Sequence, residues 1–253
     1  MIVLGREEAV EDGGLGVVRI AELIGREKSQ VSRALRTLAD SGFVDRDPLT
    51  LQYRLGWRFF ALAARAGEQR LLSVAPPLIK RLTNDLGETT HLSVLQGTEV
   101  LTVISNSPPH AVMAVGWSGR TVPVYCTSSG RALLFDRDRD SLFELLSGIE
   151  FRKLGPNTVS SVGQLYERIV AARGRGYAVV DEEFEVGLVG AAAPVRDSKG
   201  QIVAALNISA PKFRLGERLE TAGEEVKGAA DELSALLGWA SDPQLGVDFP
   251  GPS

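Results

Sequence analysis

The amino-acid sequence predicts an α+β protein in which a winged helix–turn–helix domain precedes a second α+β domain built on a curved antiparallel sheet. Two short helical patterns that meet at a glycine-containing corner occupy residues 17–41. A strand–turn–strand pattern follows in residues 43–55. From residue 89 the apolar pattern changes to short β-rich runs joined by turn residues, with helical patterns between and after them.

The corner within residues 17–41 is typical of a helix–turn–helix. The first pattern, Val18 to Ile24, is followed by Gly25, and glycine suits the left-handed residue that ends a helix. The second pattern, from about Lys28 to Ser41, has one apolar stripe. At about 100° per residue its opposite face is polar and basic, as a helix that reads a DNA major groove requires. We expect the following residues of this helix to contact DNA: Lys28, Ser29, Gln30, Ser32, Arg33 and Arg36.

A β-hairpin directly after the second helix favours this interpretation over that of an ordinary amphipathic surface helix. Residues 43–47 and 52–55 are the predicted strands, with a turn between them. This is the layout of a winged helix, and Arg46 and Arg54 are expected on or near the wing, where they can contact phosphates. Residues 26–36 carry four basic side chains and one acidic one, so positive charge is concentrated at the predicted reading helix.

Composition and charge exclude several classes of protein. The 253 residues are 44% hydrophobic and 24% charged, which suits a globular protein with two cores. The net charge of −4 argues against a protein that coats nucleic acid indiscriminately. No apolar run reaches the roughly 18 residues of a membrane helix, and the N-terminus lacks the features of a secretory signal. The single cysteine, Cys126, excludes an internal disulfide framework and is typical of the reducing cytoplasm.

The rest of the chain predicts a sheet with helices packed on it. Helical patterns cover residues 57–72, 76–86, 128–136, 138–147, 161–173 and 217–237, and Pro76 with Pro77 is expected to open the second of these helices. Strand patterns cover 91–105, which contains a hairpin turn at residues 96–99, and also 111–115, 177–181, 190–196 and 201–209.

The sequence gives little support to catalysis, to a metal centre or to a nucleotide-binding loop. Cys126 could act as a nucleophile only with His91 or His110 as its base, and neither histidine lies in a recognisable motif, so we expect an inert buried cysteine. Adjacent strand residues point to opposite faces, so the acidic run 181–183 is interpreted as a solvated or inter-subunit turn. Metal-ligand spacing, GxGxxG and P-loop patterns are absent, and we expect neither a catalytic residue, a metal nor a cofactor.

Three long motifs resemble a known family. They are VSRALRTLADSGFVDRD…YRLG (31–56), VPVYCTSSGRALL (122–134) and GYAVVDEEFEVGLVGAAAPVRDSKGQIVAALNISAP (176–211). Over about residues 13–239 the chain resembles the IclR-type bacterial transcriptional regulators. The resemblance implies a winged helix that binds DNA, in which Arg33 matches the arginine of the recognition helix. It also implies a GAF/profilin-like C-terminal domain that binds a metabolite and alters DNA binding.

The resemblance further implies an effector pocket in the C-terminal domain. A ligand carboxylate would bind backbone N–H groups at Ser128 and Ser129, where a helix begins and its first amides lack internal partners. Ser128 could instead cap that helix, and the two roles are compatible. The complete set of matching pocket positions is Ser128, Ser129, Val180, Leu188, Gly190, Asn207 and Ser209.

Two of these positions depart from the family's common pattern, and both departures bear on the ligand. Val180 and Gly190 replace an acidic residue and a cysteine, which could enlarge the cavity. Asn207 and Ser209 lie two residues apart on one strand and share a face, where they could bond the far end of a ligand. Asn207 offers both a donor and an acceptor, which suits a hydroxyl. We therefore expect a small organic acid, with an aromatic acid as the working hypothesis.

The predicted organisation has four parts. Residues 1–56 form the winged helix–turn–helix domain, 57–72 a linker helix, 73–239 the effector-binding and oligomerisation domain, and 240–253 a disordered tail rich in Pro and Gly. The first helix of a winged helix must come from residues 1–14, which could supply only a short one. This indicates either a curtailed first helix or a start codon placed downstream of the true one.

These observations together favour a cytoplasmic, ligand-responsive, sequence-specific DNA-binding regulator, a repressor and/or activator of a catabolic operon, with no enzymatic activity. Its expected partners are double-stranded operator DNA, a small organic acid as effector, and other copies of the chain in a homodimer or dimer of dimers, with no membrane partner. The alternative is a small-molecule-binding protein or metabolic enzyme that retains a vestigial winged helix. A pure interaction module would explain neither the basic helix nor the wing.

Overall fold

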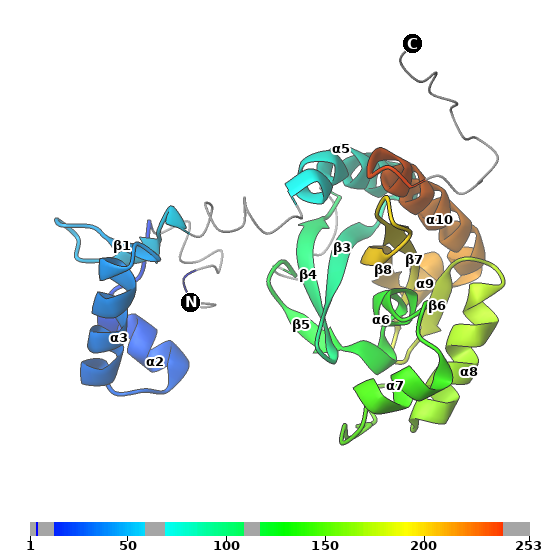
Figure 1. Ribbon diagram of the computed structural model, residues 1–253, viewed down its shortest axis with the longest axis horizontal. Coiled ribbons are helices and arrows are strands. Elements are labelled where there is room, and N and C mark those ends of the chain that lie inside the picture. Colours follow the sequence, from blue (N-terminus) through cyan, green and yellow to red (C-terminus); the bar gives the residue numbers. More distant parts are fainter. Residues whose placement is uncertain (1–3, 5–12, 59–68, 109–116, 240–253) are drawn as a thin grey trace, which may run out of the picture. The chain divides into compact units, whose positions relative to one another are not determined.

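The structure of the chain is a computed structural model that describes residue 4 and residues 13–58, 69–108 and 117–239. The chain divides into two compact units, Met1–Leu72 and Ser73–Ser253, which Figure 1 colours from blue to cyan and from cyan to red. Each unit has a hydrophobic core of its own.

The N-terminal unit contains the predicted helix–turn–helix. Helix α2 (Val17–Ile24) ends at Gly25, whose φ of 61° is left-handed, as predicted. The amides of Gly25 and Arg26 donate to carbonyls in the last turn of α2 and so satisfy groups that a helix end leaves open. Helix α3 (Lys28–Asp40) follows directly. This geometry confirms the predicted corner and fixes which face of α3 is turned away from the core.

A two-stranded wing follows α3, in agreement with the sequence. Strands β1 (Val44–Arg46) and β2 (Tyr53–Leu55) are antiparallel. Between them the Asp47 carboxylate accepts hydrogen bonds from the amides of Thr50 and Leu49, each 2.8 Å long, and these bonds lower the pKa of that carboxyl group. The small core of the unit consists of Leu4, Leu15, Ile20, Ala21, Val31, Leu35, Val44 and Tyr53.

The second unit is built on one antiparallel sheet whose strands lie in the order β5-β4-β3-β8-β7-β6. Their bounds are β3 Thr89–Gln96, β4 Glu99–Asn106, β5 Thr121–Pro123, β6 Ala178–Asp181, β7 Leu188–Arg196 and β8 Ile202–Pro211. The β3–β4 hairpin has its turn where the sequence predicts it, the β7–β8 hairpin joins the predicted strands 190–196 and 201–209, and β3 pairs with β8 at the centre. The sheet curls into a half-barrel with a concave and a convex face (Figure 1).

Two long helices lie outside the curl. Helix α10 (Leu219–Leu236) packs against β7 and β8, and α5 (Gln69–Leu86) lies beside it (Figure 1). An ion pair between Arg81 of α5 and Glu232 of α10 links the two helices. Removing their apolar faces from water stabilises the unit by about 25 cal/mol for each Å² buried.

The prediction that Pro76 and Pro77 open a new helix is wrong. Helix α5 runs unbroken from Gln69 to Leu86 with both prolines inside it. Each proline removes an amide donor, a cost that internal packing must offset. The packing is visible in the side chains that are buried at helical spacing on either side of the pair, namely Leu71, Ala75, Leu78, Ile79, Leu82 and Leu86. Residues 59–68 of the predicted linker helix lie outside the described residues.

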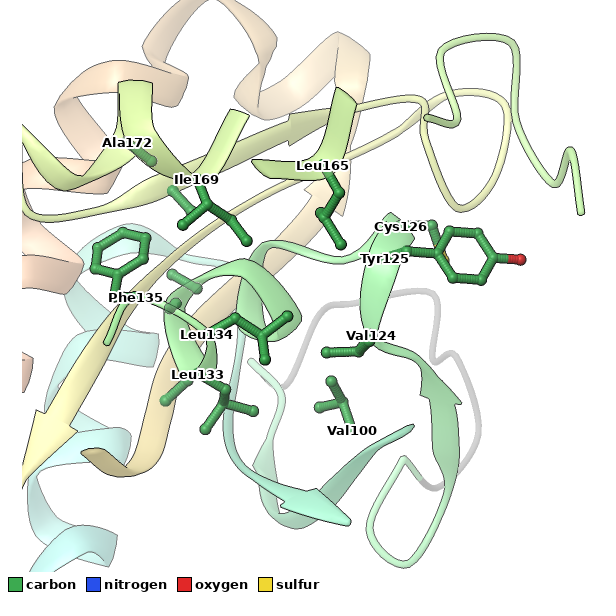
Figure 2. Packing of buried hydrophobic residues seen from close by; sticks show 14 of the residues in the cluster. Val100, Val124, Tyr125, Cys126, Leu133, Leu134, Phe135, Leu165, Ile169 and Ala172 are labelled. Carbon is green, nitrogen blue, oxygen red and sulfur yellow. The ribbon is translucent and has the colours of Figure 1, made fainter. Parts of the chain in front are cut away.

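A short helix, α6 (Ser128–Leu133), lies inside the curl and contacts β7, β8 and β6. It follows a 3-10 turn, η2 (Val124–Cys126), which packs so closely that a Cβ atom at Gly130 would lie 2.0 Å from the Val124 carbonyl oxygen. Figure 2 shows Leu133 and Leu134 near Leu165 and Ile169 of the covering helix α8 (Val162–Arg173). Helix α7 (Arg139–Leu145) contacts α8.

Some predicted elements differ from the structure at their ends. Helix α6 stops at Leu133 rather than at residue 136, and the last helical region divides into α9 (Lys212–Leu215), the 3-10 turn η3 (Gly216–Arg218) and α10. Strand β5 was not predicted because three residues ending in proline give too short a pattern. The predicted strand 111–115, the tail 240–253 and the first helix, apart from the buried Leu4, lie outside the described residues.

The substitution Gly130→Ala tests the close packing of α6. The added methyl group meets a backbone carbonyl that cannot move freely, so we expect a loss of about 1–3 kcal/mol in the free energy of unfolding. The matched control is Gly228→Ala in α10, where the new methyl meets open space and should add about 0.5–1 kcal/mol. Urea denaturation of the two variants should move in opposite directions, and a neutral Gly130→Ala would refute the packing argument.

Candidate functional site

The exposed face of α3 carries every residue predicted to read DNA from that helix. Val31 and Leu35 are buried and hold the helix against its core. The residues on its outer surface, all exposed, are Lys28, Ser29, Gln30, Ser32, Arg33 and Arg36. Three of these side chains are cationic, so the face offers hydroxyl, amide and guanidinium donors to phosphates and base edges.

Both predicted wing arginines are exposed, although each has a local partner. The Arg46 guanidinium lies over the Tyr53 ring, 5.6 Å from its centroid. Arg54 Nε lies 3.9 Å from a carboxylate oxygen of Asp45, in an ion pair that is mostly exposed. Surface pairs of this kind contribute at most about 1 kcal/mol, so Arg54 can exchange its partner for a phosphate at little cost.

In the second unit, a cavity lies on the concave face of the sheet beside α6. It has about 560 Å³ of space free of protein atoms, part of it open to solvent. Its walls include every residue predicted for the effector pocket, that is Ser128, Ser129, Val180, Leu188, Gly190, Asn207 and Ser209. Residues from α6, β6, β7 and β8 that are far apart in sequence therefore meet at one place.

One end of the cavity is formed by the first turn of α6. The Thr127 side chain caps the helix by accepting a 3.1 Å hydrogen bond from the Gly130 amide. The alternative in which Ser128 caps the helix is thus wrong, because the cap lies one residue earlier. Ser128 and Ser129 occupy the first two helical positions, where backbone amides have no acceptor within the helix. Amides and two hydroxyls together suit an anionic group.

The opposite wall is polar and belongs to the two central strands. His91 Nε2 lies 2.9 Å from Ser209 Oγ, and Ser93 Oγ donates to Asn207 Oδ1 at 3.1 Å. His91 and Asn207 are direct cross-strand partners, so both bonds run diagonally between β3 and β8. Burial lowers the pKa of His91 to about 4, which leaves the imidazole neutral at physiological pH.

Two aromatic rings complete the cavity, and sequence reasoning missed both. Trp117 makes edge-on contacts with the rings of His91 and Phe184, with centroid separations of 6.0 and 6.2 Å. Sequence reasoning also missed three polar residues of the cavity wall on the neighbouring strands, namely His91, Ser93 and Thr102. The signal that could have found His91 and Ser93 is their period of two within an otherwise buried strand, which places polar groups on the inner face.

The structure gives a second reason for the glycine at position 190. A Cβ atom there would lie 2.8 Å from the Ile208 carbonyl oxygen and 3.3 Å from Ser128 Oγ. Glycine therefore allows both the close pairing of β7 with β8 and the approach of α6. Val180, on the adjacent strand, lies beside it as an apolar wall.

Glu183 does not fit the interpretation of the acidic run 181–183 as a solvated or inter-subunit turn, because it is buried within its own chain. Its carboxylate is buried and paired with the buried Arg131 of α6, which also donates to the Val179 carbonyl at 2.8 Å. Burial raises the pKa of Glu183 and lowers that of Arg131, while their mutual attraction opposes both shifts. The neighbouring Asp181 and Glu182 pair with Lys212 at 2.8 and 2.7 Å. The buried pair of Arg131 with Glu183 therefore links α6 to the loop that carries Phe184.

The structure gives no support to cysteine chemistry. Cys126 is fully buried, and burial raises the pKa of its thiol to about 12, so it stays protonated and inert. His110, the other base considered, lies outside the described residues. Within the described ranges no cluster of His, Cys, Asp and Glu could hold a metal ion. None of the described helices combines the length and apolar character needed to cross a bilayer.

Burial of neutral His91 predicts a pH-dependent stability. The folded protein binds this proton only near pH 4, whereas the unfolded chain binds it near pH 6.5. Between these two pH values the unfolded state therefore binds more protons than the folded state. The free energy of unfolding falls by roughly 2–3 kcal/mol as the pH falls through this range. Urea unfolding at about pH 7.5 and about pH 4.5 should show a loss of stability that is larger in the wild type than in His91→Phe by this amount, because the carboxyl groups with shifted pKa values are common to both proteins. Parallel behaviour would contradict the burial argument.

Comparison with known proteins shows which family has this architecture. The family model for the bacterial transcriptional regulator IclR C-terminal domain matches residues 63–235, and that for the IclR helix-turn-helix domain matches residues 9–48. The HTH-type transcriptional regulator KdgR of Escherichia coli (strain K12) is 30% identical over 235 residues, which are 92% of this chain and 89% of KdgR.

Solved structures agree with this result. The Thermotoga maritima IclR structure is 27% identical with a TM-score of 0.68, and the match covers 89% of this chain and 92% of that one. An IclR homologue from Microbacterium hydrocarbonoxydans, crystallised with 4-hydroxybenzoate, is 28% identical with a TM-score of 0.74, covering 88% and 91% of the two chains. With both domain models matched in order along most of its length, the chain belongs to the IclR family of bacterial transcriptional regulators.

Proposed function

We propose that this protein is a cytoplasmic regulator of a catabolic operon that binds operator DNA through its winged helix and releases or engages it in response to a small organic acid. The observation that carries the proposal is the exposed polar and basic face of α3, which its buried face holds in place. A solvated surface helix would not require the paired α2, the glycine corner and the wing that accompany it.

Different residues of the winged helix serve affinity and specificity. Arg33 lies in the middle of the exposed face of α3 and is the proposed base contact, because a guanidinium can donate two hydrogen bonds to a guanine. Ser29, Gln30, Ser32 and Arg36 share this surface, while Lys28 stands at the start of the helix. On the wing, Arg46 and Arg54 are the proposed phosphate contacts, which position the domain without reading sequence.

The cavity of the second unit is the proposed effector site. The backbone amides and hydroxyls at Ser128 and Ser129 suit a carboxylate, and the apolar rings of Trp117 and Phe184 suit a flat hydrocarbon body. The related protein from Microbacterium hydrocarbonoxydans was crystallised with 4-hydroxybenzoate, which has this chemistry. We therefore propose an aromatic acid as effector, bound by the predicted pocket residues.

The assembled state is proposed to be a homodimer or a dimer of dimers. One reading helix contacts only a few base pairs, which is too few for a useful preference over the rest of a genome. Two copies related by a twofold axis would read two half-sites and multiply their affinities.

The substitution Arg33→Ala tests the assignment of the reading helix. Loss of one base contact should weaken binding to the operator by roughly 1–3 kcal/mol and relax its sequence preference. The matched control is Arg19→Ala, which removes the same charge from the exposed side of α2. This variant should leave the ratio of specific to non-specific binding unchanged. The measurement is fluorescence anisotropy with DNA from upstream of the gene and with scrambled DNA, at fixed salt.

Equal operator binding by wild type and Arg33→Ala would show that another element reads the DNA. If the wild type shows no sequence preference at all, the alternative of a small-molecule-binding protein or enzyme with a vestigial winged helix is favoured instead.

A further inference from the structure

His91 is the one buried histidine in the described part of the chain, and half of its hydrogen-bonding capacity is unused. Its exposed fraction is 4%, and it lines the cavity. Nε2 bonds to Ser209 Oγ at 2.9 Å. Nδ1 is buried and has no hydrogen-bond partner among the described residues. A buried polar atom without a partner costs free energy in the empty protein. Nδ1 is covered when the cavity is empty, so a ligand group reaches it when the imidazole ring turns toward the cavity that His91 lines, and by supplying the partner it gains affinity.

We propose that His91 selects the effector by hydrogen bonding through Nδ1 to a hydroxyl group on an aromatic acid, at the end of the ligand remote from its carboxylate. This inference rests on the proposed effector site and names the group that this site recognises.

A hydroxyl is the group that the local chemistry favours. A neutral imidazole has one N–H donor and one acceptor, and the Ser209 hydroxyl can satisfy Nε2 in either role. Nδ1 is therefore the acceptor in one tautomer and the donor in the other. A ligand hydroxyl can either donate to Nδ1 or accept from it. A methyl group can do neither, and a carboxylate can only accept.

The polar groups nearby reinforce this preference. The Ser93 hydroxyl donates to Asn207 Oδ1, which leaves the Asn207 amide nitrogen as a further neutral donor on the same wall. All of these side chains are uncharged. A second carboxylate at this end would lose its hydration without gaining a cation among the described cavity residues, so a neutral group is favoured.

The sheet places this neutral wall opposite the anion-binding end. A Cβ atom at Gly190 would lie 3.3 Å from Ser128 Oγ, so β7 marks the carboxylate end of the cavity. Gly190 pairs with Ser209 on β8, and β8 pairs with β3, which carries His91. The two ends are thus two strand spacings apart, roughly 10 Å between backbones, which leaves room for one ring between the side chains. Trp117 and Phe184 flank that space.

The test is isothermal titration of the full-length protein with matched pairs of acids, namely 3- and 4-hydroxybenzoate against 3- and 4-methylbenzoate. Hydroxyl and methyl are similar in size and differ in hydrogen bonding. The wild type should bind at least one hydroxy acid roughly 10- to 100-fold more tightly than its methyl counterpart. The variant His91→Phe keeps a ring beside Trp117 and should lose this preference or reverse it.

The matched control is Thr90→Val on the same strand. Thr90 Oγ1 is also buried and has no hydrogen-bond partner among the residues that the structure describes, but Thr90 is not one of the cavity residues. This variant should keep the wild-type preference. If it loses the preference as His91→Phe does, the selectivity reflects general damage to β3 and the inference is overturned.

A direct measurement on the wild type keeps the inference testable if His91→Phe does not fold. The nitrogen-15 resonance of His91 Nδ1 should move on addition of the hydroxy acid and stay in place with the methyl acid. Equal affinities within every pair, or an Nδ1 resonance unmoved by a bound hydroxy acid, overturn the role of His91 while leaving an aromatic-acid effector intact. If no acid of the panel binds, both the inference and the aromatic effector fall. Operator binding by the same protein then shows whether the regulator proposal survives.

Discussion

The packing of α6 against the concave face of the sheet is the constraint on which the cavity depends. Gly130 lets the helix approach η2 closely, and the buried pair of Arg131 with Glu183 ties it to the loop after β6. Removing one member of a buried ion pair leaves a charge without compensation, at a cost of about 3–5 kcal/mol. Because the amides at the start of α6 form one end of the cavity, the proposed carboxylate site depends on how rigidly this short helix is held.

A different constraint governs the DNA-binding unit. Its helices α2 and α3 have 8 and 13 residues, lengths at which isolated helices are marginal in water. The outer face of α3 therefore keeps its geometry through the few apolar residues beneath it, among them Val31, Leu35 and Val44. The proposed reading surface and the proposed effector cavity thus depend on separate cores, so the residues of each can change independently of the other.

Local sequence patterns predicted most of the elements, because helix ends and hairpin turns depend on nearby residues. Gly25 ended α2 and the turn after Gln96 joined β3 to β4 as expected. Long-range packing accounts for the failures. The prolines of α5 are tolerated because the buried helix face continues past them, and Glu183 is buried because Arg131 meets it from a distant segment. A short window of sequence contains no information about either of these long-range contacts.

The cavity could be predicted only in part, for a related reason. The family resemblance supplied seven positions that the structure brings together, but it did not indicate the wall on β3. The sequence indicates no partner for His91 other than Cys126, because its actual neighbour, Ser209, is distant in sequence and is brought close by the register of two strands. The aromatic lining had no local pattern either, since Trp117 and Phe184 lie in separate loops.

The proposed function requires that ligand binding in the cavity changes the affinity of the same chain for DNA. The most direct measurement is the affinity of the wild-type protein for its operator, by fluorescence anisotropy, with and without saturating hydroxybenzoate. Allosteric coupling of ordinary strength, about 1–3 kcal/mol, should change the dissociation constant by roughly 5- to 150-fold in one direction. If the operator affinity stays the same while titration of the same sample shows that the acid is bound, the cavity and the DNA-binding unit are not coupled.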